Sequence, residues 1–424
     1  MSVTSKSGLA ESLQAAIEGY RNRNPKSAAM LDRARAVMPG GNTRTSLWSD
    51  PFPLCIESAE GCRIRDVDGH EYIDFLGEFT AGIFGHTSPV LAEAVAQAHA
   101  DGFGLSSHTP YEVAFAERIV ERFPSMDRLR FANSGTEANM MAVMAAKLTT
   151  GRGKIAVFDG AYHGGFLSFG HGSSPVNAPF DYLLLPFNDA AAASTAFAAE
   201  GSEIAAVLVE PMQGAGGCRV ADRAFLEVLR NLTQTHGAIL IFDEVQTARM
   251  SYGGAQSIFG VIPDMTTIGK FFGGGMAFGA FGGRADIMDR FDPARPGALP
   301  HAGTFNNNRL TMAAGLAAID TYLTADKLTA LYQTGEDLQA AIKDIFKRTG
   351  APFKITGMGS IMNIHAEGTT PEEALTRQKL LRFRLLEDGY FIADRGLIAV
   401  SQAIEEKHIE GFLQSLEKVA ATCP

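Results

Sequence analysis

Short apolar segments alternate with longer helical segments along the chain from about residue 88 onward. The apolar segments are RLRFA (128–132), KIAVFD (154–159), EIAAVLVE (203–210), AILIFDEV (238–245), MTTIGK (265–270) and FGAFGG (278–283). Helical stretches such as TEANMMAVMAAKL and ADRAFLEVLRNLTQTH separate several of them. Apolar runs that do not alternate with polar residues are typical of parallel strands buried on both faces. The pattern therefore predicts an α/β core in which helices connect the strands of a parallel sheet.

The two ends of the chain follow other patterns. Residues 1–40 are predicted to be helical and amphipathic, and short strands are then expected around the turn Asp66–Gly69. Beyond about residue 320, a long helix precedes predicted strands near 354–365 and 390–400 and a final helix. This order of elements predicts a smaller α+β lobe at the C-terminal end.

Length and composition narrow the class of protein. A chain of 424 residues is longer than one ordinary core accommodates, which predicts two lobes. Hydrophobic residues make up 46% and charged residues 20%, as in folded globular proteins. The net charge of −10 and the pI near 5.5 argue against a nucleic-acid partner. The sequence has no run of 18 apolar residues and no apolar segment behind the first charges, so we expect neither a membrane span nor a signal peptide.

The cysteines give no sign of a metal site or a disulfide framework. Cys55, Cys62, Cys218 and Cys423 do not have the spacing of zinc ligands, and a chain of this size folds without disulfides. Each is interpreted as a small buried or surface residue. We therefore predict no metal and a cytoplasmic location.

A polar segment with anion-binding character follows the first predicted strand of the core. The residues Asn133-Ser134-Gly135-Thr136-Glu137 come directly after RLRFA and begin a helix. Backbone N–H groups and hydroxyls at a helix N-terminus attract anions, and the helix dipole adds to the attraction. Ser134 and Glu137 also have the spacing of a capping box, so an ordinary helix cap remains the alternative to a phosphate site.

Two further polar residues end predicted core strands. Asp243 ends the apolar run AILIFD, and a carboxylate at the carboxyl end of a buried parallel strand faces the ligand crevice of such a sheet. Lys270 stands among apolar residues and glycines in TIGKFFGGG, where a desolvated amine has a lowered pKa and can form a Schiff base. The alternatives are a helix-capping aspartate and a lysine of a surface loop.

The three signals together meet the needs of pyridoxal 5'-phosphate. This cofactor requires a phosphate site, an anion for its pyridine nitrogen and a Schiff-base lysine. Tyr162, in GAYHGG after the strand KIAVFD, is a candidate to cover the flat ring, with ordinary packing as the alternative. The neighbouring His163 is interpreted as a core imidazole whose hydrogen bonds are satisfied.

The chain resembles the class III aminotransferases of pyridoxal phosphate fold type I, in particular the branch with glutamate-1-semialdehyde aminomutases and β-phenylalanine (β-amino acid) aminotransferases. The resemblance rests on segments that follow one another from residue 38 to 308: MPGGNTR, FANSGTEANMMA, GAYHGG, VLVEPMQG, IFDEVQT, PDMTTIGKFFGGGMAFGAFGG and AGTFNNN. It implies an α/β fold with a mixed, mainly parallel sheet covered by helices in a large cofactor-binding domain (76–318). Residues 1–75 and 319–424 would form a smaller α+β domain.

The resemblance also implies roles for individual residues. Lys270 and Asp243 would be catalytic, as the Schiff-base lysine and the partner of the pyridine nitrogen. Glu210 would be a buried supporting residue. The implied cofactor-binding set comprises Lys270, Asp243, Ser134, Gly135, Thr136, Tyr162, Gln213 near the ring hydroxyl, and Thr304 from the partner subunit of a homodimer.

Two arginines are candidates for binding carboxylates. Arg is suited to bidentate carboxylate recognition, although a surface ion pair is the alternative for each. The resemblance implies that Arg44 binds the carboxylate of a β-amino acid and that Arg395 is a movable residue for the second carboxylate of the acceptor. The segment Gln246–Met250 lacks the Gly-containing pattern of the diamine and ornithine enzymes, which argues against assigning the chain to them. The β-amino acid branch resembles the chain better, in MPGGNTR, PFPL and HAGTFNNN.

The implied activity is therefore transfer of the amino group of a β-amino acid, aromatic as in β-phenylalanine, to a 2-keto acid such as 2-oxoglutarate. The alternatives are a glutamate-1-semialdehyde-type 2,1-aminomutase, an amino-acid racemase on the same scaffold, or a cofactor-binding protein without turnover. Intact Lys270 and Asp243 argue against the last of these.

Overall fold

The computed structural model describes residues 3–102, 104–170 and 172–422, so Cys423 lies outside the described residues. The chain forms two compact units. The large unit comprises Pro89–Tyr332, and the terminal unit comprises Met1–Ser88 together with Gln333–Pro424. The large domain expected from the sequence, 76–318, begins and ends earlier in the chain than the large unit of the structure, Pro89–Tyr332.

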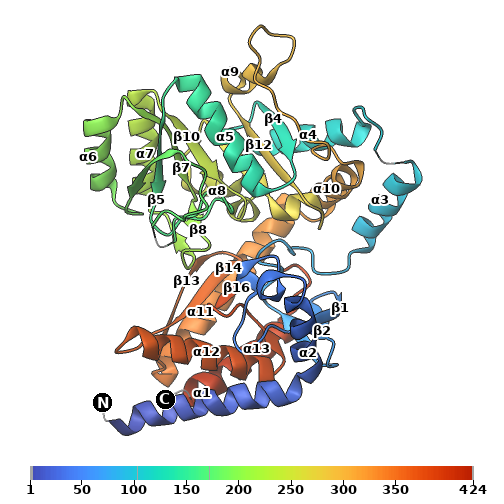
Figure 1. Cartoon of the computed structure of the whole chain (residues 1–424), viewed down its shortest axis with the longest axis vertical. Helices are drawn as coiled ribbons and strands as arrows, with labels where there is room; N and C mark the ends of the chain where they lie inside the picture. The colour runs from blue at the N-terminus through green and yellow to red at the C-terminus, as the bar shows by residue number, and fades with distance from the viewer. Residues whose placement is uncertain (1–2, 103, 171, 423–424) are drawn as a thin grey trace. The chain divides into compact units, whose positions relative to one another are not determined.

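A seven-stranded sheet forms the centre of the large unit, in the order β4-β12-β11-β10-β7-β5-β6 (Figure 1). Its strands are β4 (Arg128–Ala132), β5 (Lys154–Phe158), β6 (Asp181–Leu185), β7 (Ile204–Val209), β10 (Ile239–Asp243), β11 (Met265–Gly269) and β12 (Gly279–Gly283). All pairs are parallel except those of β12, which runs antiparallel to both β11 and β4. The mixed, mainly parallel sheet is thus confirmed, whereas the apolar pattern alone had predicted parallel strands throughout.

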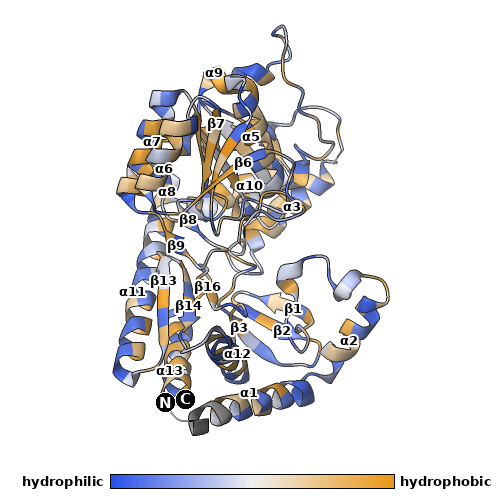
Figure 2. Cartoon of the chain, turned by 60° about the vertical axis from the view of Figure 1, so that its left-hand side comes forward, coloured by the Kyte–Doolittle hydropathy of each residue, from blue (hydrophilic) through white to orange (hydrophobic). Residues whose placement is uncertain are grey.

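Helices surround this sheet. The large unit contains α3 (Pro89–Ala100), α4 (Pro110–Arg122), α5 (Gly135–Thr150), α6 (Ala190–Glu200), α7 (Arg223–His236), α8 (Gly254–Phe259), α9 (Ala285–Met288) and α10 (Arg309–Thr321). Helix α5 packs along β11 and β12, while α6 lies beside α7 and α7 contacts β10 (Figure 1). Fully buried alanines of α5, among them Ala138 and Ala142, pack against the sheet with Val157 and Leu208. Their small side chains let the helix lie close to the strands, which are strongly hydrophobic at β7 (Figure 2).

The terminal unit contains two smaller sheets. One has the order β1-β2-β3-β15 and comprises β1 (Ile56–Glu60), β2 (Arg63–Asp66), β3 (Glu71–Asp74) and β15 (Tyr390–Phe391). The other has the order β13-β14-β16 and comprises β13 (Phe353–Met358), β14 (Ile361–Ala366) and β16 (Leu397–Ala399). These strands confirm the expected smaller α+β part.

The helices of the terminal unit are α1 (Val3–Arg23), α2 (Pro25–Arg35), α12 (Pro371–Glu387) and α13 (Glu406–Thr422), and α11 (Ala325–Thr349) continues into it from the large unit. The single helical region expected over 1–40 is two helices, because Pro25 begins α2 and cannot donate a hydrogen bond within α1. Tyr20 anchors α1: its ring contacts Phe383 and its hydroxyl donates to the carbonyl of Phe52 at 2.8 Å. No helix within the described residues is long and apolar enough to cross a membrane.

Candidate active site

The candidate residues of the large unit follow one edge of its sheet. The six parallel strands all end at this edge, where ligands of open α/β sheets bind. Ser134–Thr136 follow β4, Tyr162 follows β5, Glu210 and Gln213 follow β7, Asp243 ends β10, and Lys270 follows β11. Asp243 is paired in register with Thr267, three residues before Lys270, on the neighbouring strand. The structure thus brings these predicted site residues to a common edge.

The N-terminus of α5 is closely surrounded by backbone from other segments. Ser134 is its N-cap and accepts a hydrogen bond from the N–H of Glu137 at 3.1 Å, so the helix cap considered as the alternative is present. Gly164, at φ +113°, approaches the helix so closely that a Cβ there would lie 2.2 Å from Oγ1 of Thr136. Gly279 has no room for a side chain either, because its Cβ would meet the carbonyl of Ser134 at 2.1 Å. The first-turn N–H groups of a helix lack partners within the helix, so the chemistry of this end suits an anion such as a phosphate.

Asp243 is a buried carboxylate held by three donors. Its side chain is 5% exposed. Its Oδ2 atom accepts from Nδ2 of Asn139 at 2.8 Å and lies 2.8 Å from Nδ1 of His163, while its Oδ1 accepts from the N–H of Val245 at 3.0 Å. Asn139 is itself fixed, because its Oδ1 accepts from the hydroxyl of Thr267 at 2.6 Å. A buried charge requires such partners, and they orient the carboxylate.

His163 differs from its sequence interpretation. It is buried, as expected, but only one of its ring nitrogens has a partner: Nδ1 contacts Asp243, whereas the buried Nε2 has no hydrogen-bond partner among the residues that the structure describes. The expectation of a satisfied core imidazole is therefore wrong. Neither His163 nor Asn139 was singled out as a site residue, because each meets Asp243 only through the folding of distant strands. The GAYHGG motif was the available signal for His163.

Glu210 lies in the same buried cluster. Burial raises the pKa of Glu210 to about 7, and the charge of Asp243 adds to the rise, while His163 opposes it. The carboxylate accepts from the N–H groups of Tyr162 at 2.9 Å and Gly214 at 3.1 Å. It thereby fixes the loop that carries Tyr162, whose side chain is exposed and can cover a planar ligand.

Lys270 adopts a backbone conformation that lysine rarely adopts. Its φ is +53°, a left-handed value that is sterically costly for any residue with a Cβ. The fully buried Phe271 and Phe272 follow it and fix the turn at the end of β11. Backbone strain of this kind is concentrated at functional sites, where the surrounding fold maintains it.

Gln213 is already engaged in the structure. It is completely buried; its amide nitrogen donates to the carbonyl of Asp159 at 3.0 Å, and its amide oxygen accepts from Nη2 of Arg219 at 2.6 Å. Its amide nitrogen carries a second N–H, which is the donor that the predicted contact with the ring hydroxyl would use.

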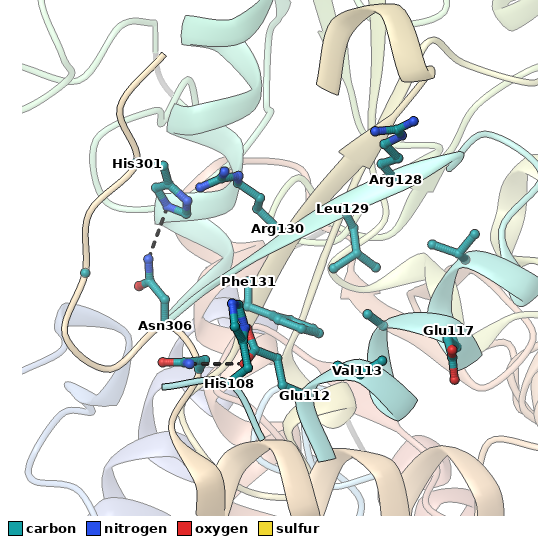
Figure 3. Close-up of a pocket in the computed structure, with 14 residues that line it drawn as sticks. His108, Glu112, Val113, Glu117, Arg128, Leu129, Arg130, Phe131, His301 and Asn306 are labelled. Atoms are coloured by element: carbon teal, nitrogen blue, oxygen red, sulfur yellow. Dashed lines mark hydrogen bonds and ion pairs between the residues drawn. The ribbon is translucent and has the colours of Figure 1, made fainter. Parts of the chain in front are cut away.

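Thr304 lies in an exposed loop that is hydrogen-bonded to Asn133, the residue between β4 and the N-cap of α5. Asn306 of this loop accepts from Nδ2 of Asn133 at 2.8 Å, and its own amide nitrogen lies 3.3 Å from Nε2 of His301. The loop borders a cavity of about 600 Å³ that α4 and β4 also line (Figure 3). Thr304 and the adjacent Phe305 are exposed.

Arg44 and Arg395 both belong to the terminal unit. Arg44 is exposed; its Nη2 atom lies 2.9 Å from Oε1 of Glu78 and its guanidinium 5.7 Å from the ring centroid of Phe79. Arg395 is exposed in the turn between β15 and β16, where its carbonyl accepts from Nδ2 of Asn363 at 2.9 Å. The surface ion pair considered for Arg44 is thus present, with Glu78 as its partner.

Comparison with known proteins yields consistent similarities. A sequence model of the class-III aminotransferase family matches residues 45–420. The chain is 44% identical over 414 residues to the beta-phenylalanine transaminase of Variovorax paradoxus, covering 95% of both chains. A glutamate-1-semialdehyde 2,1-aminomutase of Sorangium cellulosum is 41% identical over 361 residues, covering 81% of this chain and 82% of the relative.

Solved structures give the same result. The beta-phenylalanine aminotransferase of Variovorax paradoxus superimposes with a TM-score of 0.94 at 43% identity, covering 97% of each chain. A transaminase solved with PLP bound has a TM-score of 0.88 at 36% identity, covering 94% of this chain and 98% of that chain.

Proposed function

The chain belongs to the class-III aminotransferases, and from this premise we propose that it moves the amino group of a β-amino acid of the β-phenylalanine type to a 2-keto acid such as 2-oxoglutarate. The observation that carries the choice of donor is the 44% identity to a beta-phenylalanine transaminase over 95% of both chains. The exposed Arg44 beside the Phe79 ring supports it, because a carboxylate and a phenyl group require these two kinds of partner.

The protein is a transaminase that uses pyridoxal 5'-phosphate. When bound, this cofactor supplies a carbonyl that takes up the amine and a ring that withdraws electrons from the amine-bearing carbon. The residues at the sheet edge fit it: a helix N-terminus shaped by Gly164 and Gly279 for the phosphate, and the buried carboxylate of Asp243 for a protonated ring nitrogen.

Residues at the sheet edge bind and orient the cofactor. In this proposal Ser134, Gly135 and Thr136 hold the phosphate at the N-terminus of α5, and Tyr162 covers one face of the ring. Asp243 keeps the proton on the ring nitrogen, and its contacts with Asn139 and His163 hold its carboxylate in place.

Lys270 carries the proton transfer. Its amine is proposed to hold the cofactor covalently before the donor enters, and then to take the proton from the amine-bearing carbon as a general base. The strained backbone at φ +53° and the buried phenylalanines after it hold the start of this side chain in one place. Positioning of this kind lowers the entropic cost of the proton transfer.

The two arginines are proposed to divide the carboxylates between them. Arg44 binds the carboxylate of the donor, and Arg395 serves the distal carboxylate of the acceptor. Loss of a charged hydrogen-bond pair costs about ten- to a hundredfold in binding. Arg44→Ala should therefore slow the donor half-reaction by about that factor, and Arg395→Ala the half-reaction with 2-oxoglutarate, with pyruvate less affected. Equal effects of both variants on both half-reactions would contradict this division.

The experiment that tests the function is a donor assay with 3-amino-3-phenylpropanoate and 2-oxoglutarate, in which glutamate is measured. Glutamate should form in step with the β-keto product. A second candidate function, 2,1-aminomutase activity, is favoured by the 41% identity to a glutamate-1-semialdehyde 2,1-aminomutase. An aminomutase would convert glutamate-1-semialdehyde repeatedly without any second substrate, whereas a transaminase given only its donor stops after one product per site.

We further propose a cytoplasmic homodimer in which Thr304 completes the phosphate site of the partner subunit. The exposed Thr304 and Phe305 at the border of the cavity support a contact there with a second copy. None of the three described cysteines forms a disulfide, which is consistent with a reducing compartment.

A further inference from the structure

A run of left-handed residues lies in the terminal unit after β3. Glu78, Phe79 and Thr80 have φ angles of +48°, +50° and +81°, directly after Gly77 at +55°. Non-glycine residues with positive φ are uncommon singly, and here three occur in succession. None of the three residues is glycine or asparagine, which adopt positive φ most readily, so the surrounding fold must maintain the turn.

The buried carboxylate of Asp74 holds this turn at its start. Its Oδ1 accepts from the N–H groups of Leu76 at 2.8 Å and Gly77 at 3.1 Å, while its Oδ2 lies 2.8 Å from Nε2 of His86. The N–H of Gly82 closes the turn on the carbonyl of Gly77 at 2.9 Å. Hydrogen bonds made by Asp74 and Gly82 therefore fix the turn, and neither residue lies at its tip.

The tip presents two side chains to Arg44. The carboxylate of Glu78 lies 2.9 Å from Nη2 of Arg44, and the guanidinium lies over the Phe79 ring. The side chains of the ion pair are about half exposed, 47% for Arg44 and 57% for Glu78. An ion pair this exposed is weak, so another carboxylate can displace Glu78 without loss of a buried interaction.

We propose that Glu78 determines specificity as the resident counter-ion of Arg44, which the carboxylate of a substrate must displace; this rests on the proposed role of Arg44 in binding the donor. Glu78 occupies a guanidinium nitrogen that a bidentate carboxylate requires. It therefore lowers the affinity for carboxylates and speeds release of the acidic product. It has no such effect on an uncharged ligand, because such a ligand does not compete for Arg44.

The test is calorimetric titration of the holoenzyme with 3-phenylpropanoate, a carboxylate that lacks the amine and cannot react. Glu78→Gln keeps the size of the side chain and removes its charge. The Kd of 3-phenylpropanoate should fall by about two- to fivefold, the range expected for an exposed ion pair. The Kd of the neutral 3-phenylpropanamide should stay unchanged. Glu71→Gln, which removes an equal charge from an exposed position of β3, is the matched control and should leave both Kd values unchanged.

Combination with Arg44→Ala distinguishes the ways in which the proposal can fail. In that background Glu78→Gln should have no effect on 3-phenylpropanoate. Weaker binding by Glu78→Gln alone would overturn the proposal, because Glu78 would then only orient Arg44. Tighter binding that persists without Arg44 would overturn it as well, as a long-range charge effect. If Arg44→Ala itself leaves the Kd unchanged, the role of Arg44 in the proposed function and the role of Glu78 fail together, while the donor assay still tests the transamination independently.

Discussion

Nδ1 of His163 lies 2.8 Å from Oδ2 of Asp243 in the interior of the large unit. The two residues come from different strands: His163 follows β5, and Asp243 ends β10. With Asn139 and Glu210 they form a buried polar cluster behind the sheet edge. In the proposed function Asp243 pairs with the ring nitrogen of the cofactor, so changes within this cluster should act on that nitrogen through Asp243.

Replacement of His163 should lower the rate without abolishing it. His163→Phe removes a hydrogen-bond partner of a buried carboxylate, which costs about 1.5–3 kcal/mol. We expect kcat to fall by about ten- to a hundredfold, and the pH dependence of the cofactor absorbance to shift. His163→Asn, whose amide nitrogen can replace Nδ1, should recover part of the rate. Unchanged kcat and absorbance in His163→Phe would show that Asp243 does not need this partner.

Glu210 should make the stability of the protein depend on pH in a defined range. Its pKa is raised from 4.5 to about 7 chiefly by burial. Between these values only the folded chain holds the proton, so the free energy of unfolding falls as pH rises, by on the order of 3 kcal/mol in total, and levels off above about pH 7. Glu210→Gln should flatten this part of the profile, measured by denaturant unfolding from pH 5 to 8. A profile identical to that of the wild type would contradict the buried, protonated carboxyl.

Glycine at position 270 should give a more stable fold than alanine. Elsewhere glycine in place of alanine usually destabilises a fold, but a φ of +53° is unfavourable for any side chain. Lys270→Gly should therefore be more stable than Lys270→Ala by about 1 kcal/mol, and both should lack turnover. Thermal unfolding of the two variants measures the difference. Greater stability of the alanine variant would mean that Lys270 is not strained.

Mixed dimers should test whether Thr304 serves the neighbouring site. Lys270→Ala and Thr304→Ala subunits are each expected to have impaired activity, the first without turnover and the second with weakened cofactor binding. A mixed dimer would contain one site with Lys270 from one subunit and Thr304 from the other, so mixing after dissociation should restore activity at that site. Activity that stays at the average of the two variants would place Thr304 at the site of its own subunit, and a monomer in light scattering would exclude the arrangement.

Much of this fold could be predicted from the sequence because its strands are continuous apolar runs. The prediction of parallel strands was wrong for β12, because an apolar run does not indicate the direction of its strand. GAFGG has the composition of a buried strand, yet β12 is antiparallel to both of its neighbours. Strand β6 was not predicted, although its residues 182–185 form a short apolar run; it is an edge strand that pairs only with β5 and leaves Asp181 and Leu184 exposed.

The site was predictable to the extent that it follows single strands. Ser134, Asp243 and Lys270 each stand directly after an apolar run, and a parallel sheet brings such positions to one edge. The contacts of His163 with Asp243 and of Arg44 with Glu78 depend on how distant segments meet. No spacing within the sequence encodes these contacts, so they emerge only from the three-dimensional structure.

The choice of donor is tested most directly by one ratio: kcat/KM for 3-amino-3-phenylpropanoate divided by kcat/KM for its isomer 2-amino-3-phenylpropanoate, at saturating 2-oxoglutarate. The two donors have the same atoms and the same groups, and differ only in the distance between amine and carboxylate. If the site is built for a β-amino acid, the β isomer should be preferred by at least about tenfold, since a misplaced charged contact costs more than 1.4 kcal/mol in the transition state. A ratio at or below one would contradict the proposed function.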